Sequence, residues 1–165
     1  MAACEPRRLH PHLQRHPSQI NELSLEAGVK LDPRTRGAYV DEHYMTNIDG
    51  IFAAGNVLHV HDLVDYVSLE AERLAAYAAS YIKDGSLPPC PFPVACGENA
   101  GHVLPQRISG TSGVQISLRV REPLQNCRIV VMQADTVVIH DVFGLGSDVI
   151  VTKTVGEIES SSISQ

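Results

Sequence analysis

The spacing of apolar residues changes along the chain, and this change constrains the fold more than any other feature. From residue 67 to residue 82, apolar side chains recur at steps of three and four, which predicts one stripe along a long helix. The stripe consists of Val67, Ala71, Leu74, Ala75, Ala78 and Ile82. From residue 114 to residue 121, apolar and polar side chains alternate, which predicts a strand with one buried face. The chain therefore joins a helix-containing module to a β-rich module.

The predicted long helix has recognisable signals at both ends. Asp62 or Asp65 can cap its start, and Gly85 followed by Pro88 and Pro89 ends it. The run 50–55 comes just before it, is apolar and is bracketed by glycines. This pattern predicts a strand that is buried on both faces in a parallel sheet.

Shorter elements are expected on either side of these. Residues 21–28 predict a short helix closed by Gly28, and residues 29–31 and 38–40 predict short strands with a turn at Asp32 and Pro33 between them. After residue 114, runs at 127–133, 136–142 and 149–155 alternate with turn residues, which predicts an antiparallel meander or a small sandwich.

These patterns divide the chain into five parts. We expect an irregular leader at 1–21, an α/β segment at 22–87, a linker at 88–102, an antiparallel β module at 103–156 and a flexible tail at 157–165. The fold class is therefore α/β, with a small antiparallel β module after it.

Composition narrows the kind of protein. The 165 residues carry 13 Lys and Arg against 19 Asp and Glu, and the net charge of -6 disfavours attraction to nucleic acid or anionic lipid. No apolar run approaches the roughly 18 residues that cross a bilayer, and the first residues lack the apolar stretch of a secretion signal. The cysteines, Cys4, Cys90, Cys96 and Cys127, form no C-x-x-C pair, so we expect reduced thiols in a cytoplasmic protein.

The most informative stretch for function runs from Thr46 to Val57. A buried strand that ends in glycine lets a ligand approach the backbone closely at Gly55, and the Asn56 side chain offers both a donor and an acceptor. The helix that follows would point its unpaired N–H groups and its positive dipole end at the same region. Such a region is suited to an anionic or electron-rich cofactor, although a plain strand-to-helix turn would use the same residues.

This stretch and the alanine-rich helix after it resemble the carboxyl-terminal FAD-contact segment of the FAD-dependent pyridine nucleotide-disulfide oxidoreductases. The pattern is matched by Thr46, Ile51, Phe52, Ala53, Gly55 and Asn56. The string from Gly55 to Asp65 is similar to a branch of FAD/NAD(P)-binding oxidoreductases found beside glycerol-3-phosphate dehydrogenase-like proteins. The resemblance implies that residues 22–87 end an FAD-binding Rossmann-like domain, and that the cofactor is contacted by Gly55, Asn56, Val57, Asp65, Tyr66, Val67 and Ser68.

Two departures limit what this resemblance implies. Asn56 stands where the family has an aspartate, which removes a charge but keeps the hydrogen bonding. The chain also has no G-x-G-x-x-G turn, the turn that holds the nucleotide diphosphate in this family. We therefore expect a fragment or subunit of a flavin-dependent oxidoreductase that uses FAD and NAD(P), is inactive alone and needs a missing nucleotide-binding region or a partner chain. The alternative is a noncatalytic interaction or oligomerisation module.

Two histidines near the turn raise the question of a metal. His59 and His61 are two residues apart, and with Asp62 or Asp65 they could ligate zinc or iron. The sequence shows no third ligand at a fixed spacing, so the prediction assigns no metal. Instead these histidines are expected to line a flavin-facing loop or to be solvated, and either of them could relay a proton.

Overall fold

A computed structural model describes residues 21–61, 64–97, 99–111, 113–121, 124–133, 136–145 and 153–155. The helical elements are α2 (Glu22–Glu26), the short 3-10 helix η2 (Gly55–Val57) and α3 (Val64–Asp84). The strands are β1 (Phe92–Pro93), β2 (Ala100–Leu104), β3 (Arg107–Ile108), β4 (Val114–Val120), β5 (Leu124–Gln133), β6 (Thr136–Leu145) and β7 (Lys153–Val155).

The two helices confirm the predictions made for them. The amide of Gly28 donates to the carbonyl of Leu25 just beyond α2, and Gly28 has the positive φ of 79° that glycine adopts easily. Gly85 ends α3 in the same conformation, with φ of 75°. Asp65 lies inside the first turn of α3 and is not its cap, and Asp62 lies outside the described residues.

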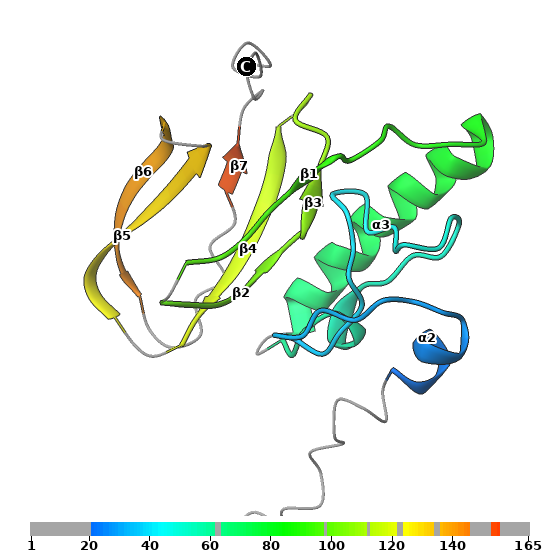
Figure 1. The fold of residues 1–165 in the computed structure, drawn as a ribbon, viewed down its shortest axis with the longest axis horizontal. Coiled ribbons are helices and arrows are strands. Elements are labelled where there is room, and N and C mark those ends of the chain that lie inside the picture. Colours follow the sequence, from blue (N-terminus) through cyan, green and yellow to red (C-terminus); the bar gives the residue numbers. More distant parts are fainter. Residues whose placement is uncertain are drawn as a thin grey trace, which may run out of the picture.

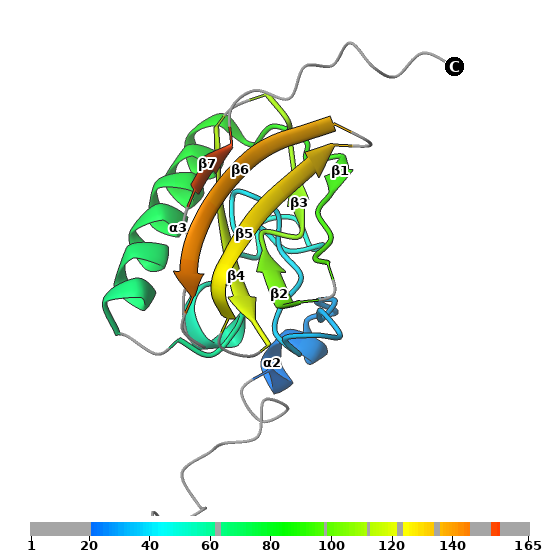
Figure 2. The same cartoon turned by 90° about the vertical axis from the view of Figure 1, so that its left-hand side faces the viewer.

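The strands are arranged in three antiparallel groups, in the orders β1-β3, β2-β4-β7 and β5-β6. The β5–β6 hairpin and α3 lie on opposite sides of the β2-β4-β7 sheet (Figures 1 and 2). Every second residue of β4 from Val114 is apolar, and three of these four, Val114, Ile116 and Val120, are buried, which confirms the predicted alternation. The mixed helix and antiparallel-strand composition of the fold is thus as expected.

The predicted strand at 50–55 is wrong. Within the described residues this run pairs only through the single antiparallel bridge between Met45 and Phe52, and its end is the η2 turn. Residues 29–31 and 38–40 likewise meet in one bridge, between Leu31 and Ala38. All pairings between the named strands are antiparallel, so the described residues form no parallel sheet.

The apolar stripe predicted for α3 only partly faces the protein. Val67, Leu74 and Ala78 are half-buried, whereas Ala71, Ala75 and Ile82 are exposed. The inward face also carries polar and aromatic side chains, and the one fully buried residue of the helix is Glu70. The helix is therefore held by a mixed face against the loops of residues 43–61, and much of its apolar surface is left open.

One core is shared by residues on both sides of the predicted linker. Leu104 of β2 packs with Val29, Val40 and Leu58, which all come from the first 60 residues. The buried Gln106 side chain donates to Asp32 at 2.9 Å and accepts from the amide of Val40 at 2.9 Å. The predicted linker itself contains β1 and most of β2.

Other expectations fall partly outside the described residues. They include the tail at 157–165, the leader up to residue 20, the turn residues between the runs 127–133 and 136–142, and residues 149–152 of the last predicted strand. β5, β6 and β7 lie at the predicted runs, and β5 and β6 extend beyond them, to Leu124 and Leu145. No run was predicted for β1, β2 or β3.

Candidate functional site

The turn before α3 is formed by Gly55, whose φ of 72° disfavours any residue with a side chain. A β-carbon placed there would also lie 3.0 Å from Cγ1 of Val67, since η2 packs directly against α3. Gly55 is therefore required by the local geometry whether or not a ligand binds.

The structure brings the other predicted cofactor contacts to the same end of α3. Asn56, Asp65 and Ser68 are exposed, and Val57, Tyr66 and Val67 are half-buried. The Asn56 carboxamide oxygen accepts a hydrogen bond from the amide of His61 at 3.3 Å, which folds the loop after η2 back on itself. Ser68 donates to the carbonyl of Val64 one helical turn earlier, at 3.4 Å.

The same turn carries a buried cluster of two histidines and one glutamate, which we call the His–Glu cluster: His59, His61 and Glu70. Nε2 of His59 lies 3.2 Å from Oε1 of Glu70, and Nε2 of His61 lies 3.0 Å from Oε2. The three side chains are only 3%, 2% and 8% exposed. One carboxylate on α3 therefore holds both histidines of the loop that precedes the helix.

Glu70 is also tied to the turn itself, because the amide of Gly55 donates to Oε2 at 2.9 Å. Burial alone would raise the pKa of this carboxyl group, but the hydrogen bonds from His59, His61 and Gly55 outweigh it and lower the pKa to about 2. Glu70 is thus a buried carboxylate that stays ionised.

A third histidine lies behind the cluster. Nε2 of His102, on β2, lies 3.3 Å from Nδ1 of His59, and both side chains are buried. Burial lowers the pKa of His102 to about 4, with a further contribution from the neighbouring His59 and Arg119, so this ring is neutral at pH 7. Nδ1 of His61 is also buried, and it has no hydrogen-bond partner in the part of the chain that the structure describes.

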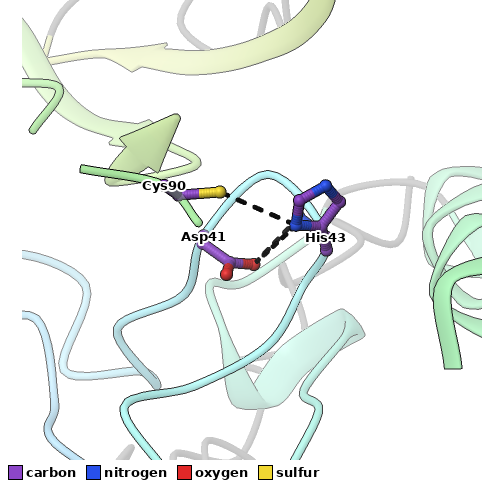
Figure 3. Close-up of side chains that lie close together, drawn as sticks. All are labelled: Asp41, His43 and Cys90. Atoms are coloured by element: carbon purple, nitrogen blue, oxygen red, sulfur yellow. Dashed lines mark hydrogen bonds and ion pairs between the residues drawn. The ribbon is translucent and has the colours of Figure 1, made fainter. Parts of the chain in front are cut away.

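A second cluster joins Asp41, His43 and Cys90. The Cys90 sulfur lies 3.6 Å from Nδ1 of His43, and a carboxylate oxygen of Asp41 lies 3.9 Å from the same nitrogen (Figure 3). Burial and the nearby carboxylates of Asp41 and Glu42 raise the pKa of the Cys90 thiol to about 12. A nucleophilic cysteine needs a lowered pKa, so this arrangement does not activate Cys90.

Both Cys90 and Cys96 are free thiols, as predicted. Cys90 is 5% exposed, whereas Cys96 is half-buried and accepts a hydrogen bond from the Arg34 guanidinium at 2.7 Å.

A small cavity of about 50 Å³ lies between α3, the loop 40–44 and the start of β4. Its wall includes Glu42, Tyr44, Glu70, Arg73 and Tyr77. The volume suffices for a few water molecules but is far below the several hundred Å³ of a pocket for an organic cofactor. The cavity is therefore large enough for water beside Glu70 but not for a flavin.

Sequence reasoning found His59 and His61 but missed Glu70 and His102. A signal for Glu70 was present, because it lies three residues after Val67 and four before Leu74 and so interrupts the inward face of the helix. His102 carried no such signal, since its contact with His59 spans 43 residues.

Comparison with family models, curated proteins and solved structures finds no match to this chain. Among the helices that the structure describes, none is long and apolar enough to span a membrane.

Proposed function

We propose that the chain supplies the carboxyl-terminal part of a flavin-dependent oxidoreductase, in which electrons pass between NAD(P)H or a small reduced substrate and FAD. Residues 22–87 would then be the end of a Rossmann-like FAD-binding domain. The observation that carries the proposal is the turn at Gly55, which leads through η2 toward the 21-residue helix α3. Its residues are also those that match the FAD-contact pattern.

The residues at this turn fit an exposed contact with FAD better than a closed pocket. The amide of Gly55 is already bonded to Glu70, so a phosphate would be met by the amides of the first turn of α3, which have no partner within the helix. Asn56 is exposed, and its Nδ2 can donate to a ligand on the same side. The remainder of the cofactor would be held by a nucleotide-binding region that this sequence lacks.

FAD, when bound, would supply the hydride or electron-pair transfer, and the residues of this chain would bind and orient it. The amino-terminal end of α3 would stabilise negative charge on the cofactor through the helix dipole. Glu70 would act indirectly, because its bonds to Gly55, His59 and His61 hold the turn in place.

The open side of α3 supports the need for a further region or partner chain. Val64 is 78% exposed, Leu69 43% and Ile82 83%. Val64 and Ile82 lie on one side of the helix with the exposed Ala71 and Ala75 between them, and an exposed apolar row of this kind is typical of a surface that another segment covers. A missing amino-terminal flavin- and nicotinamide-binding region would be such a segment.

The test is the thermal stability of the purified chain with and without FAD. We expect FAD to raise Tm, because a ligand that binds the folded state stabilises it. Gly55→Val should abolish the rise by distorting the turn, and Ser68→Trp, at an exposed helical position, should reduce it by covering the surface while the turn stays intact. Gly97→Val is the matched control, since no atom lies within 4 Å of a β-carbon at that position. An unchanged Tm with FAD, or an equal rise in all variants, would contradict the proposal.

The second candidate is a noncatalytic interaction module, and the same exposed side chains on α3 favour it. It predicts self-association of the chain that Ile82→Glu weakens, together with no response to FAD. Light scattering of the wild type and this variant distinguishes the two candidates, because FAD binding at the turn does not depend on residue 82.

A further inference from the structure

Three metal-ligating side chains converge in the His–Glu cluster from two different elements. His59 and His61 come from the loop after η2, and Glu70 comes from the second turn of α3. One ligand atom of each residue can be chosen so that all three lie within 4.8 Å of one another. The cluster therefore offers two imidazole nitrogens and one carboxylate oxygen to a common point.

The separations suit a four-coordinate transition metal. A metal bound at ~2.1 Å to tetrahedrally placed nitrogen and oxygen ligands separates those ligands by ~3.4 Å. The carboxylate of Glu70 lies 3.2 Å from Nε2 of His59 and 3.0 Å from Nε2 of His61. Small outward movements of these side chains would place an ion between them.

The charge of the cluster also favours a cation. Glu70 is a buried carboxylate whose described hydrogen-bond partners are two imidazoles and one backbone amide. Buried charges in proteins are normally paired or coordinate metals. A divalent ion would compensate the charge where the two histidines approach it.

The surroundings provide the supporting contacts that metal ligands need. Metal-bound histidines usually donate their second N–H to an acceptor, and ligating carboxylates are themselves hydrogen-bonded. Nδ1 of His59 lies 3.3 Å from Nε2 of His102, which can accept a hydrogen bond from it, and Glu70 accepts from the amide of Gly55. Among the described residues, Nδ1 of His61 has no acceptor.

We propose that His59, His61 and Glu70 bind a divalent transition-metal ion of the zinc class, with His102 as a positioning residue. Two histidines and one glutamate leave the fourth position of a tetrahedral ion open to water. Glu70 also forms part of the wall of the small cavity beside α3, so water can lie next to one ligand of the site. The ion would fasten the loop after η2 to α3, and this role is independent of whether FAD binds.

The experiment is a zinc titration of the full chain by calorimetry. Because His10, His12 and His16 could bind zinc elsewhere, the three are replaced by glutamine in all proteins compared. This background protein should bind about one zinc ion per chain, release protons on binding and gain thermal stability.

Variants in this background identify the ligands. His61→Gln and Glu70→Gln should weaken zinc binding by more than ~100-fold, and His102→Gln by ~10–100-fold, as expected for a supporting contact. Asp65→Asn is the matched control, because it removes an exposed carboxylate from the same helix and should leave the affinity unchanged.

A second measurement tests the site without any ligand variant, in case those variants fail to fold. The visible spectrum of the Co²⁺-loaded background protein should show the strong bands of a four-coordinate site, since coordination geometry is diagnostic of the ligand set. Absence of saturable zinc binding, the weak spectrum of a six-coordinate surface ion, or unchanged affinity in folded His61→Gln and Glu70→Gln proteins would each overturn the proposal. Any of these results would leave the FAD proposal standing.

Discussion

Replacing Glu70 by leucine tests how much the His–Glu cluster contributes to folding. The substitution removes the acceptor for three donors, which are the amide of Gly55 and the Nε2 atoms of His59 and His61. Each buried donor left unpaired costs about 1–3 kcal/mol, although a histidine can reduce its cost by moving its proton to Nδ1. The Gly55 amide has no such alternative. Because the histidines also lose a buried charged partner, we expect the free energy of unfolding to fall by about 3–5 kcal/mol in total.

The assay is urea unfolding followed by circular dichroism in the presence of a metal chelator, so that only protein contacts are measured. The midpoint should fall without a change in slope, because the surface exposed on unfolding stays the same. Glu70→Gln keeps an acceptor oxygen, so it should lower the free energy of unfolding less than Glu70→Leu does. Glu72→Leu is the control on the exposed side of α3, where surface substitutions stay within about 0.5 kcal/mol. Equal stability of Glu70→Leu and Glu72→Leu would refute the reasoning.

Two further predictions concern other parts of the protein. Gly37→Ala should lower the free energy of unfolding by at least about 1–3 kcal/mol, because the new β-carbon would collide with the backbone carbonyl of Leu58. Gly97→Ala is the control, since its β-carbon would meet no neighbour. Equal urea midpoints for the two variants would contradict the close packing of Gly37 against Leu58. Cys90, with its pKa raised to about 12, stays a thiol until the pH approaches that value, so iodoacetamide at pH 8 should modify Cys96 in the native protein well before Cys90. Mass spectrometry of the labelled peptides measures both rates, and equal rates would show that Cys90 is not protected.

The parts of the fold that could be predicted are those that local sequence determines. The helix ending before Gly85 and the strand from Val114 to Val120 follow from apolar spacing and end signals that lie within a few residues. The run 50–55 was misjudged because its apolar character reflects burial of single residues such as Ala53 among loops, not pairing with neighbouring strands.

In the candidate site, too, the residues set by local sequence could be predicted and those set by distant packing could not. The residues around Gly55 and Asn56 are consecutive and could be recognised as a turn before a helix. Glu70 joins the His–Glu cluster because its side of α3 faces the protein. The apolar stripe predicted a different side, and three of its residues, Ala71, Ala75 and Ile82, are exposed. His102 reaches His59 because β2 packs beside the loop after η2, and this packing of distant segments is not encoded in any local pattern.

The most direct test of the proposed function is a two-dimensional ¹H–¹⁵N NMR spectrum of the full chain titrated with FAD. The account predicts concentration-dependent shifts at Gly55, Asn56 and the amides of residues 65–68, with the β4 amides unchanged. Shifts confined to other residues, or no shift at any FAD concentration, would contradict the assignment of the flavin contact to the start of α3.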